Sequence, residues 1–328
     1  MQANTKKITI IVRKFANVGK IPYFCICKRA IHILTMMLKG RHSNLHPLLK
    51  IAEWLGLMLG CTLLVFAIWR LLPINHGSTG ALLTFQALQA IGLFIVPALA
   101  VAYLWSDNPM QYLHMGQQSA VSSRQSDGWL IPLSMGVMIT AIPLINCLVA
   151  LNGLLRLPES LSGLEQWMRM MEEQTEQLLM RFMTCHDGAW WMLLVNIVVL
   201  AVLPAIGEEL TFRGVLQSLF RNRHVAVWVT AFVFSFVHFQ FYGFLPRLLL
   251  GAMLGYALVW SGRIGYSMIM HATNNALSVL VFYLSTYVWH IAQADIDALG
   301  TGQTWWLTLV CTPLMLALMY IFYRRCAK

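Results

Sequence analysis

The chain has 328 residues, of which 58% are hydrophobic and only 11% are charged. Soluble globular proteins average about 25% charged residues, so this composition excludes a soluble domain and indicates a polytopic membrane protein. The seven cysteines show no CxxC spacing and mostly lie in apolar runs. They are therefore interpreted as packing residues rather than as a disulfide or metal cluster.

The net charge of +10 arises entirely from residues 1–50, which contain ten Lys or Arg and no Asp or Glu. A basic segment next to a first apolar span is typical of a cytoplasmic topology signal. Contact with anionic lipid or nucleic acid is an alternative interpretation, and so is a translation start at Met36 or Met37. We predict a basic cytoplasmic segment over 1–50 and an integral membrane domain over 51–328, and no nucleic-acid partner is expected.

Eight apolar stretches are candidates for membrane-spanning helices. The fourth is longer than one crossing requires, and Pro204 and Gly207 predict a kink in it. We therefore expect an all-α polytopic membrane protein with about eight transmembrane helices around an intramembrane polar cavity. The stretches are Ile51–Leu72, Ala81–Trp105, Trp129–Leu154, Ala189 to about Phe220, Val225–Tyr242, Phe244–Trp260, Ile264–Trp289 and Trp305–Tyr323.

The charges of the connecting loops alternate along the chain. On one side of the membrane, Asn75–Gly80 has no Lys or Arg, and the loop His290–Thr304 carries only Asp295 and Asp297. The segment Arg156–Gly188 belongs to the same side, because its three Arg are outweighed by six acids, whereas the alternate loops and the tail are basic. Because Lys and Arg accumulate on the cytoplasmic side, both termini are predicted to be cytoplasmic. The basic positions are Arg124, Arg221, Arg223, Arg263, Arg324, Arg325 and Lys328.

Two further patterns concern packing. The segment Arg156–Gly188 has apolar residues at intervals of three to four, which predicts an amphipathic helix. This helix is expected either to lie on the outer membrane surface or to act as a lid that contacts substrate. Gly251 and Gly255 form a GxxxG, which is typical of close helix packing inside a bundle.

Ionisable residues inside apolar stretches indicate a functional site. Glu208 and Glu209 are adjacent, and Glu209 precedes Arg213 by four residues, the spacing of a helical ion pair. At 1.5 Å per residue, Glu208, His238, His271 and Asn275 are expected at roughly the same depth, about 12–20 Å from the cytoplasmic side. His238 is expected inside the helix of the fifth stretch, and His271 and Asn275 on one face of the seventh.

Such a set of residues can hydrolyse a peptide bond in two ways. A carboxylate and a histidine can deprotonate water, while a second histidine and an amide stabilise the oxyanion. Alternatively, Glu208, His238 and His271 could bind Zn²⁺, which would acidify the water. The third interpretation is a set of satisfied polar groups that hold helices together.

These residues also form three motifs. Glu208 to Arg213 matches EExxxR, Phe234 to His238 matches FxxxH, and His271 to Asn275 matches HxxxN. In this order they resemble the CPBP intramembrane proteases, also called the Abi or CAAX-protease and bacteriocin-processing family, which includes CAAX prenyl endopeptidases of the Ras-converting type. The resemblance covers about residues 190–287.

The resemblance implies an eight-helix fold with a site in a cavity open to the cytosol. It implies that Glu208 activates water beside His238, that His271 and Asn275 form the oxyanion side, and that Glu209 and Arg213 brace the site. Zn²⁺ is a candidate cofactor, and a metal-free, glutamate-dependent mechanism is the other candidate.

We therefore predict an intramembrane endopeptidase that acts on a membrane-associated protein or a leader peptide, with a prenylated substrate among the options. Membrane lipid is the other expected partner. The alternative is a non-catalytic scaffold or a bacteriocin self-immunity protein of the same fold. A transporter is disfavoured because no internal repeat is present. The chain also lacks HExxH and GxSxG, which excludes the common zincin and rhomboid-like sites.

Overall fold

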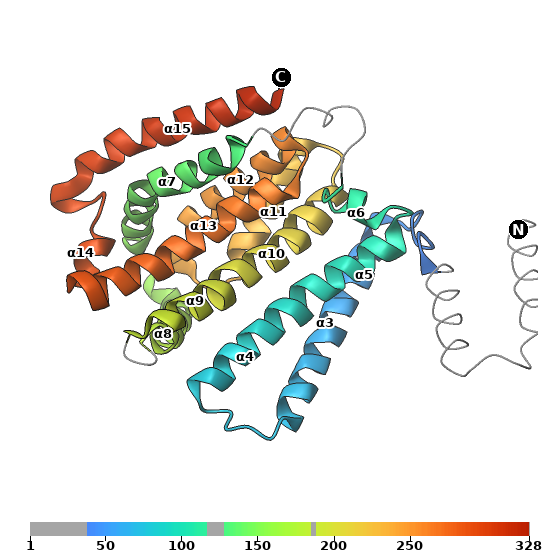
Figure 1. Cartoon of the computed structure of the whole chain (residues 1–328), viewed down its shortest axis with the longest axis horizontal. Helices are drawn as coiled ribbons and strands as arrows, with labels where there is room; N and C mark the ends of the chain where they lie inside the picture. The colour runs from blue at the N-terminus through green and yellow to red at the C-terminus, as the bar shows by residue number, and fades with distance from the viewer. Residues whose placement is uncertain (1–37, 117–127, 185–187, 328) are drawn as a thin grey trace, which may run out of the picture.

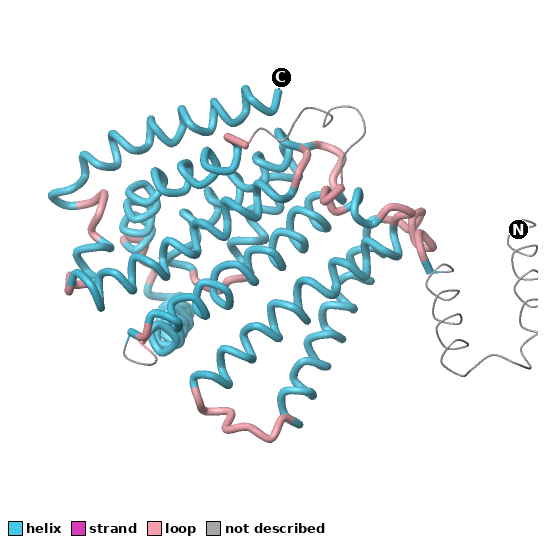
Figure 2. The backbone as a smooth tube through the Cα atoms, in the orientation of Figure 1, coloured by secondary structure: helices cyan, strands magenta, loops and turns pink. Residues whose placement is uncertain are grey.

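The computed structural model describes residues 38–116, 128–184 and 188–327, and within these ranges the chain is helical without a strand (Figures 1 and 2). The predicted all-α class is therefore confirmed. Most of the predicted basic segment lies outside the described residues, and so do Met36, Met37 and Arg124. The two-part division at residue 50 stays a prediction.

Six helical stretches are long and apolar enough to cross a membrane, which supports an integral membrane protein. The predicted number of eight is not confirmed, because two of the eight stretches fall outside this set. Helix α11 (Arg223–Phe236) has only 14 residues, and α13 (Ile264–Tyr283) carries the polar residues of the site. The six are Pro47–Leu71, Thr79–Trp105, Leu130–Gly153, Trp190–Leu219, Phe241–Ser261 and Gln293–Ala327.

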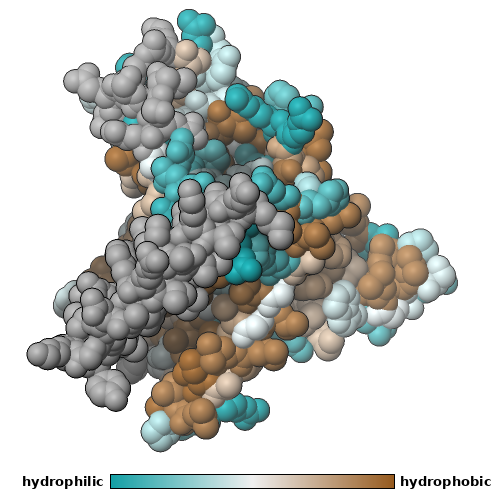
Figure 3. Space-filling model, turned by 90° about the vertical axis from the view of Figure 1, so that its right-hand side faces the viewer, coloured by the Kyte–Doolittle hydropathy of each residue, from teal (hydrophilic) through white to brown (hydrophobic). Residues whose placement is uncertain are grey.

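The apolar helices leave much of their surface uncovered by protein. Helix α3 (Pro47–Leu71) has charged residues only near its two ends, yet only 11% of its most apolar window is buried. Leu59 and Leu63 are 62% and 61% exposed. Figure 3 shows apolar side chains spread over much of one face of the molecule. Such helices require a hydrocarbon surrounding, because water would penalise this exposed area.

The fourth predicted stretch forms one continuous helical run, Trp190–Leu219. In chain order it comprises α9 (Trp190–Asn196), a π-helix (Ile197–Val202), α10 (Leu203–Glu209), a second π-helix (Leu210–Leu216) and a 3₁₀ turn (Gln217–Leu219). Proline cannot donate the regular helical hydrogen bond, and the π segment that ends two residues before Pro204 accommodates this. The predicted disturbance at Pro204 is thus a change of helical register within a continuous helix (Figure 1).

Close packing fixes α10 against the second long helix. That helix comprises α4 (Thr79–Gln89), a π segment (Ala90–Ile95) and α5 (Val96–Trp105). A Cβ atom added at Gly207 would lie 2.8 Å from Phe94 Cβ and 3.0 Å from the Ala90 carbonyl oxygen. The Thr211 hydroxyl donates to the Phe94 carbonyl at 3.1 Å. The glycine before Glu208 therefore allows the two backbones to approach, and this contact orients the site helix.

The other helices cover the opposite side of the site. Helix α15 (Trp305–Ala327) packs along α7 (Leu130–Gly153), and α12 (Phe244–Ser261) lies between α11 and α13. A Cβ atom at Gly251 would lie 3.1 Å from Ala231 Cα, and one at Gly255 would lie 3.0 Å from Val227 Cγ1. The GxxxG prediction of close helix packing is therefore confirmed, with α11 as the partner.

The predicted amphipathic helix is present as α8 (Ser162–Met183). Its Glu165 accepts from Arg169 at 2.7 Å, and this hydrogen bond, followed by that from the Leu157 backbone, lowers the pKa of Glu165 to about 2. The stabilisation from this carboxylate is therefore present above its ordinary pKa and is lost as the pH falls toward 2. Helix α8 also contacts the segment after α11, because Glu172 accepts from the Tyr242 backbone N–H at 3.2 Å.

Candidate active site

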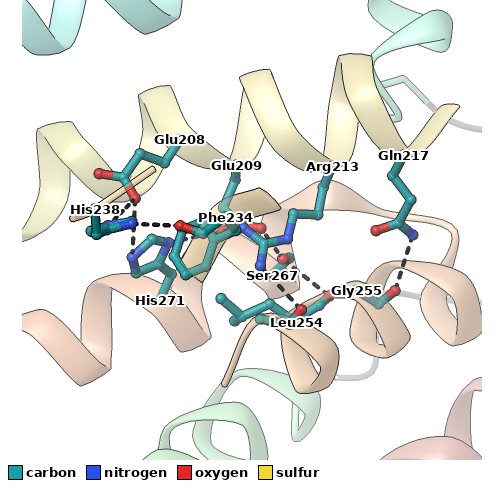
Figure 4. A network of polar contacts seen from close by, with 11 residues as sticks. Glu208, Glu209, Arg213, Gln217, Phe234, His238, Leu254, Gly255, Ser267 and His271 are labelled. Carbon is teal, nitrogen blue, oxygen red and sulfur yellow. Dashed lines mark hydrogen bonds and ion pairs between the residues drawn. The ribbon is translucent and has the colours of Figure 1, made fainter. Parts of the chain in front are cut away.

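The two adjacent carboxylates at the end of α10 point to different surroundings (Figure 4). Consecutive helical residues are separated by about 100° around the axis. Glu209 is fully buried, whereas the Glu208 side chain retains 13% exposure. The sequence interpretation, in which Glu209 serves the helix ion pair and Glu208 remains available, agrees with this geometry.

Glu209 is the centre of a buried polar network. Its Oε1 accepts from Arg213 Nη1 at 2.7 Å and from His271 Nδ1 at 2.8 Å. Its Oε2 accepts from the Ser267 hydroxyl. Three donors on one carboxylate, one of them a guanidinium, are the arrangement that a buried charge requires. The predicted ion pair between Glu209 and Arg213 is confirmed.

Arg213 connects this network to two other helices. Its Nη2 donates to the Gly251 carbonyl of α12 at 3.1 Å. The guanidinium carbon lies 4.5 Å from the centre of the Phe234 ring of α11, a cation–π contact. The same phenyl ring packs edge-on against His238 and His271. Arg213 and Phe234 thereby fix the positions of both histidines relative to α10.

Both histidines turn a lone pair toward Glu208. His238 Nδ1 lies 2.6 Å from the Phe234 carbonyl oxygen, and His271 Nδ1 lies on the Glu209 carboxylate. Because these oxygens only accept, we assign the proton of each neutral imidazole to Nδ1. Each Nε2 then faces Glu208 as an acceptor.

Three acceptor atoms therefore converge on one small space. Glu208 Oε2 lies 3.7 Å from His238 Nε2 and 3.8 Å from His271 Nε2, and it has no hydrogen-bond partner among the described residues. Such distances exceed a direct hydrogen bond. A water molecule held there has two hydrogens, so it could donate to Glu208 Oε2 and to one of the two imidazole nitrogens.

His238 lies beyond the end of α11, and the prediction that it lies inside a membrane helix is wrong. The helix ends at Phe236, a turn follows at Val237 and His238, and Phe239 has a φ of +53°. The residues after His238 are mostly apolar, so hydropathy alone predicted a helix as far as Tyr242, although the helix ends at Phe236.

Three helices hold the segment that carries His238. From α7, Asn152 Nδ2 donates to the Phe241 carbonyl at 2.7 Å. From α12, Arg247 Nη1 donates to the Gln240 carbonyl at 3.1 Å. From α8, Glu172 accepts the Tyr242 N–H. These contacts compensate for the absent helix and keep the imidazole opposite Glu208.

Asn275 is the predicted site residue that the described contacts do not join to the others. It is half-buried on α13, one turn beyond His271, and its side-chain oxygen accepts from Asn274 Nδ2 at 3.2 Å. Its position on the helix is compatible with a donor on the oxyanion side, and that role stays a prediction.

Sequence reasoning missed two members of the network and assigned no role to a third. Ser267 lies four residues before His271, so both project from one face of α13. Gln217 lies four residues after Arg213, and its Nε2 donates to the Gly255 carbonyl at 3.3 Å. Helical spacing could have found both. Phe234 appeared only as the first residue of a motif, because its ring contacts depend on tertiary packing.

A cavity of about 560 Å³ lies between α7, α8, α13 and α14 (Gln293–Asp297). It is adjacent to the site, because Asn274 lines it and also bonds to Asn275. Apolar side chains dominate its wall, and two carboxylates are present. Its lining includes Ile145, Glu176, Met180, Asn274, Leu277 and Asp297.

The fit of a metal ion rests on the donors around Glu208. As they stand, the described residues contain no group of three or more His, Cys, Asp or Glu side chains that could hold a metal ion. The donor types are nevertheless those of zinc sites, and the Nδ1 atom of each histidine is bonded to an oxygen, as in metal-ligating histidines. The predicted metal ligands therefore fit in chemistry, and the cofactor stays a prediction.

The fold and the site together define a helical membrane protein with a carboxylate and two histidines at a buried centre. Residues 190–277 match the family model described as Type II CAAX prenyl endopeptidase Rce1-like. This segment contains all six predicted site residues. The match confirms the family resemblance that the three motifs indicated, and it supports a membrane protease.

A more distant similarity covers a comparable length of chain. Over 86 residues the chain is 30% identical to the Uncharacterized protein YpbD of Bacillus subtilis (strain 168). The alignment covers 25% of this chain and 43% of that relative, so the chain spans less than half of its length. No solved structure matches the chain.

Proposed function

We propose that this protein is an intramembrane endopeptidase that hydrolyses a peptide bond of a membrane-associated protein or peptide. The observation that supports this most directly is the buried Glu208 Oε2, which lacks a partner among the described residues and faces two imidazole nitrogens. A purely structural carboxylate would be satisfied as Glu209 is. The family match supports the same reaction class.

In the proposed reaction a water molecule donates to Glu208 Oε2 and to His238 Nε2. Glu208 takes one proton as the water oxygen attacks the scissile carbonyl carbon, and the carbonyl electrons move to its oxygen. The Asn275 amide donates to this oxyanion. His271 would donate to it as an imidazolium, with Nδ1–H on Glu209 and Nε2–H on the oxyanion. Collapse of the intermediate breaks the C–N bond, and the leaving amine takes the proton from Glu208.

A zinc ion at this site would be held by Glu208, His238 and His271. When bound, it would lower the pKa of a bound water and polarise the substrate carbonyl. With or without zinc, the hydrogen bonds to the Nδ1 atoms of the two histidines hold the imidazole rings in position. Glu209 fixes the His271 ring, and the Phe234 carbonyl fixes the His238 ring.

The choice between the two mechanisms is tested by metal content and chelation. We expect peptide hydrolysis by the purified protein to be lost in Glu208→Gln. About one Zn²⁺ per chain, with cleavage abolished by a chelator and restored by Zn²⁺, would establish the metal-dependent form. Cleavage that persists in metal-depleted protein would establish the glutamate-dependent form. An absence of cleavage over a broad panel of membrane-anchored, prenylated and leader peptides would contradict the proposed function.

The 560 Å³ cavity is proposed to receive an apolar part of the substrate, because its wall is mainly apolar and includes Asn274, which donates to Asn275. Replacing Leu277 with Trp is expected to raise KM about ten-fold, since a missing apolar contact of this size corresponds to about 1–3 kcal/mol. The kcat value should change little because Leu277 does not contact Glu208. The matched control is Leu316→Trp on the exposed face of α15. An equal KM for both variants would exclude this cavity as a substrate subsite.

A further inference from the structure

A second cavity, of about 300 Å³, lies at the opposite end of the polar network from His238. Arg213 and Gln217 line it, and both project from the site helix (Figure 4). The other walls come from the connection to α11 and from the end of α12. Its polar lining consists of His114, Arg213, Gln217, Ser218, Arg221 and Arg223.

This cavity is strongly basic. Three arginines and one histidine line it, and no Asp or Glu is among its lining residues. Arg213 is balanced by Glu209, whereas Arg221 and Arg223 are exposed and have no ion-pair partner among the described residues. Burial lowers the pKa of His114, so the excess positive charge at neutral pH is carried by the two arginines. The cavity therefore favours an anionic ligand.

Buried polar atoms on its wall lack partners. The Arg213 side chain is fully buried, and its Nε has no hydrogen-bond partner among the described residues. Gln217 is 6% exposed, and its Oε1 is also without a partner. Leaving such groups unsatisfied is costly. A guanidinium N–H matches an anionic oxygen, and an amide oxygen matches a hydroxyl group.

The position of the cavity indicates the source of the anion. Arg221 lies in the short connection after Leu219, which the loop charges predict to be cytoplasmic, and Arg223 is the first residue of the helix that follows. Helix α11 begins at Arg223 and runs for 14 residues, so its N-terminus adds partial positive charge at the same place. Basic pockets between transmembrane helices at this level bind anionic headgroups.

We propose that this cavity binds a phosphate group, supplied by the headgroup of an anionic, hydroxyl-bearing lipid. The phosphate is expected to lie between Arg221 and Arg223 and to accept from Arg213 Nε, while a headgroup hydroxyl donates to Gln217 Oε1. The same guanidinium holds Glu209, which in turn holds His271. Lipid binding would therefore stabilise the arrangement of the site, a consequence that rests on the proposed function.

The test measures lipid binding on the full chain in detergent, with phosphatidylglycerol and phosphatidylcholine compared by native mass spectrometry and by thermal melting. The double variant Arg221→Gln/Arg223→Gln is expected to weaken phosphatidylglycerol binding about 30-fold, which is the combined contribution of two basic residues near a headgroup. The matched control Arg324→Gln/Arg325→Gln removes the same charge from the tail and should leave binding unchanged.

The possible outcomes are distinct. Tight binding of phosphatidylglycerol that the first double variant alone loses would support the lipid form of the proposal. Equal competition by inorganic phosphate or glycerol phosphate would support a phosphate site with a soluble ligand. No preference over phosphatidylcholine, or equal effects of both double variants, would overturn it. Lipid binding is also measured in Glu208→Gln, where it should be unchanged because this residue does not line the cavity. If the wild type binds the lipid but cleaves no peptide, only the proposed function is contradicted.

Discussion

Replacing Glu208 with Gln is expected to lower kcat/KM for peptide hydrolysis by about 10²–10⁴-fold, the usual contribution of a general base. The amide keeps the size of the side chain but cannot take a proton from water. Because Glu208 shares no hydrogen bond with Glu209 or Arg213 among the described contacts, the melting temperature should remain near that of the wild type.

Glu209→Gln is the matched control for this experiment. It has the same change of atoms one residue along the helix, but it leaves the Arg213 guanidinium buried without a charged partner. It should therefore reduce the melting temperature as well as activity. Turnover retained in Glu208→Gln, or melting reduced equally by both variants, would show that Glu208 is structural.

Replacing Arg213 with Ala is expected to reduce the free energy of unfolding by about 3–5 kcal/mol, the usual effect of removing one partner of a buried ion pair. The pair is fully buried, with a separation of 2.7 Å between nitrogen and oxygen. The substitution also removes the contact with Phe234 and the donor to Gly251. For a chain of this size the melting temperature should fall on the order of 10 °C.

A double-mutant cycle distinguishes the pair from simple loss of volume. Arg213→Met keeps much of the volume, and Glu209→Gln removes the opposing charge. If the two charges depend on one another, the double variant should be more stable than the sum of the single effects predicts. Strict additivity, or unchanged melting of Arg213→Ala, would contradict the structural role of this pair. Activity should be low in Arg213→Met, in Glu209→Gln and in the double variant. Glu209→Gln removes the carboxylate that accepts from His271, and Arg213→Met allows that carboxylate to move.

The sequence was sufficient for the helical class and for most of the site, because both depend on local patterns. The spacing of Glu209 and Arg213 predicted their contact, since a helix brings residues four apart together. The depth estimate correctly brought Glu208, His238 and His271 to one place, as the distances of 3.7 and 3.8 Å show.

Other features depend on chain direction and tertiary contacts, which hydropathy does not record. The segment around Phe239 is as apolar as a helix but turns there, so His238 was expected within α11. The difference between eight expected spans and six candidate spans has a related origin. The polar residues of the site make α13 less apolar than a lipid-facing helix, and α11 is short because the chain turns after Phe236. The role of Phe234 arises from packing between distant helices, which the spacing of residues along the chain does not record.

The π-helical segments on either side of α10 have a consequence for how sequences that share the three motifs can vary. A π turn contains about one residue more than an α turn, and each residue corresponds to about 100° of rotation. The direction in which Glu208 faces is thus determined by the number of residues in Ile197–Val202 as much as by its own identity. A relative that lost one residue from this segment would keep its EExxxR motif yet turn the glutamates away from the histidines. The length of this helix is therefore part of the site, although no side chain in Ile197–Val202 takes part in the described polar contacts.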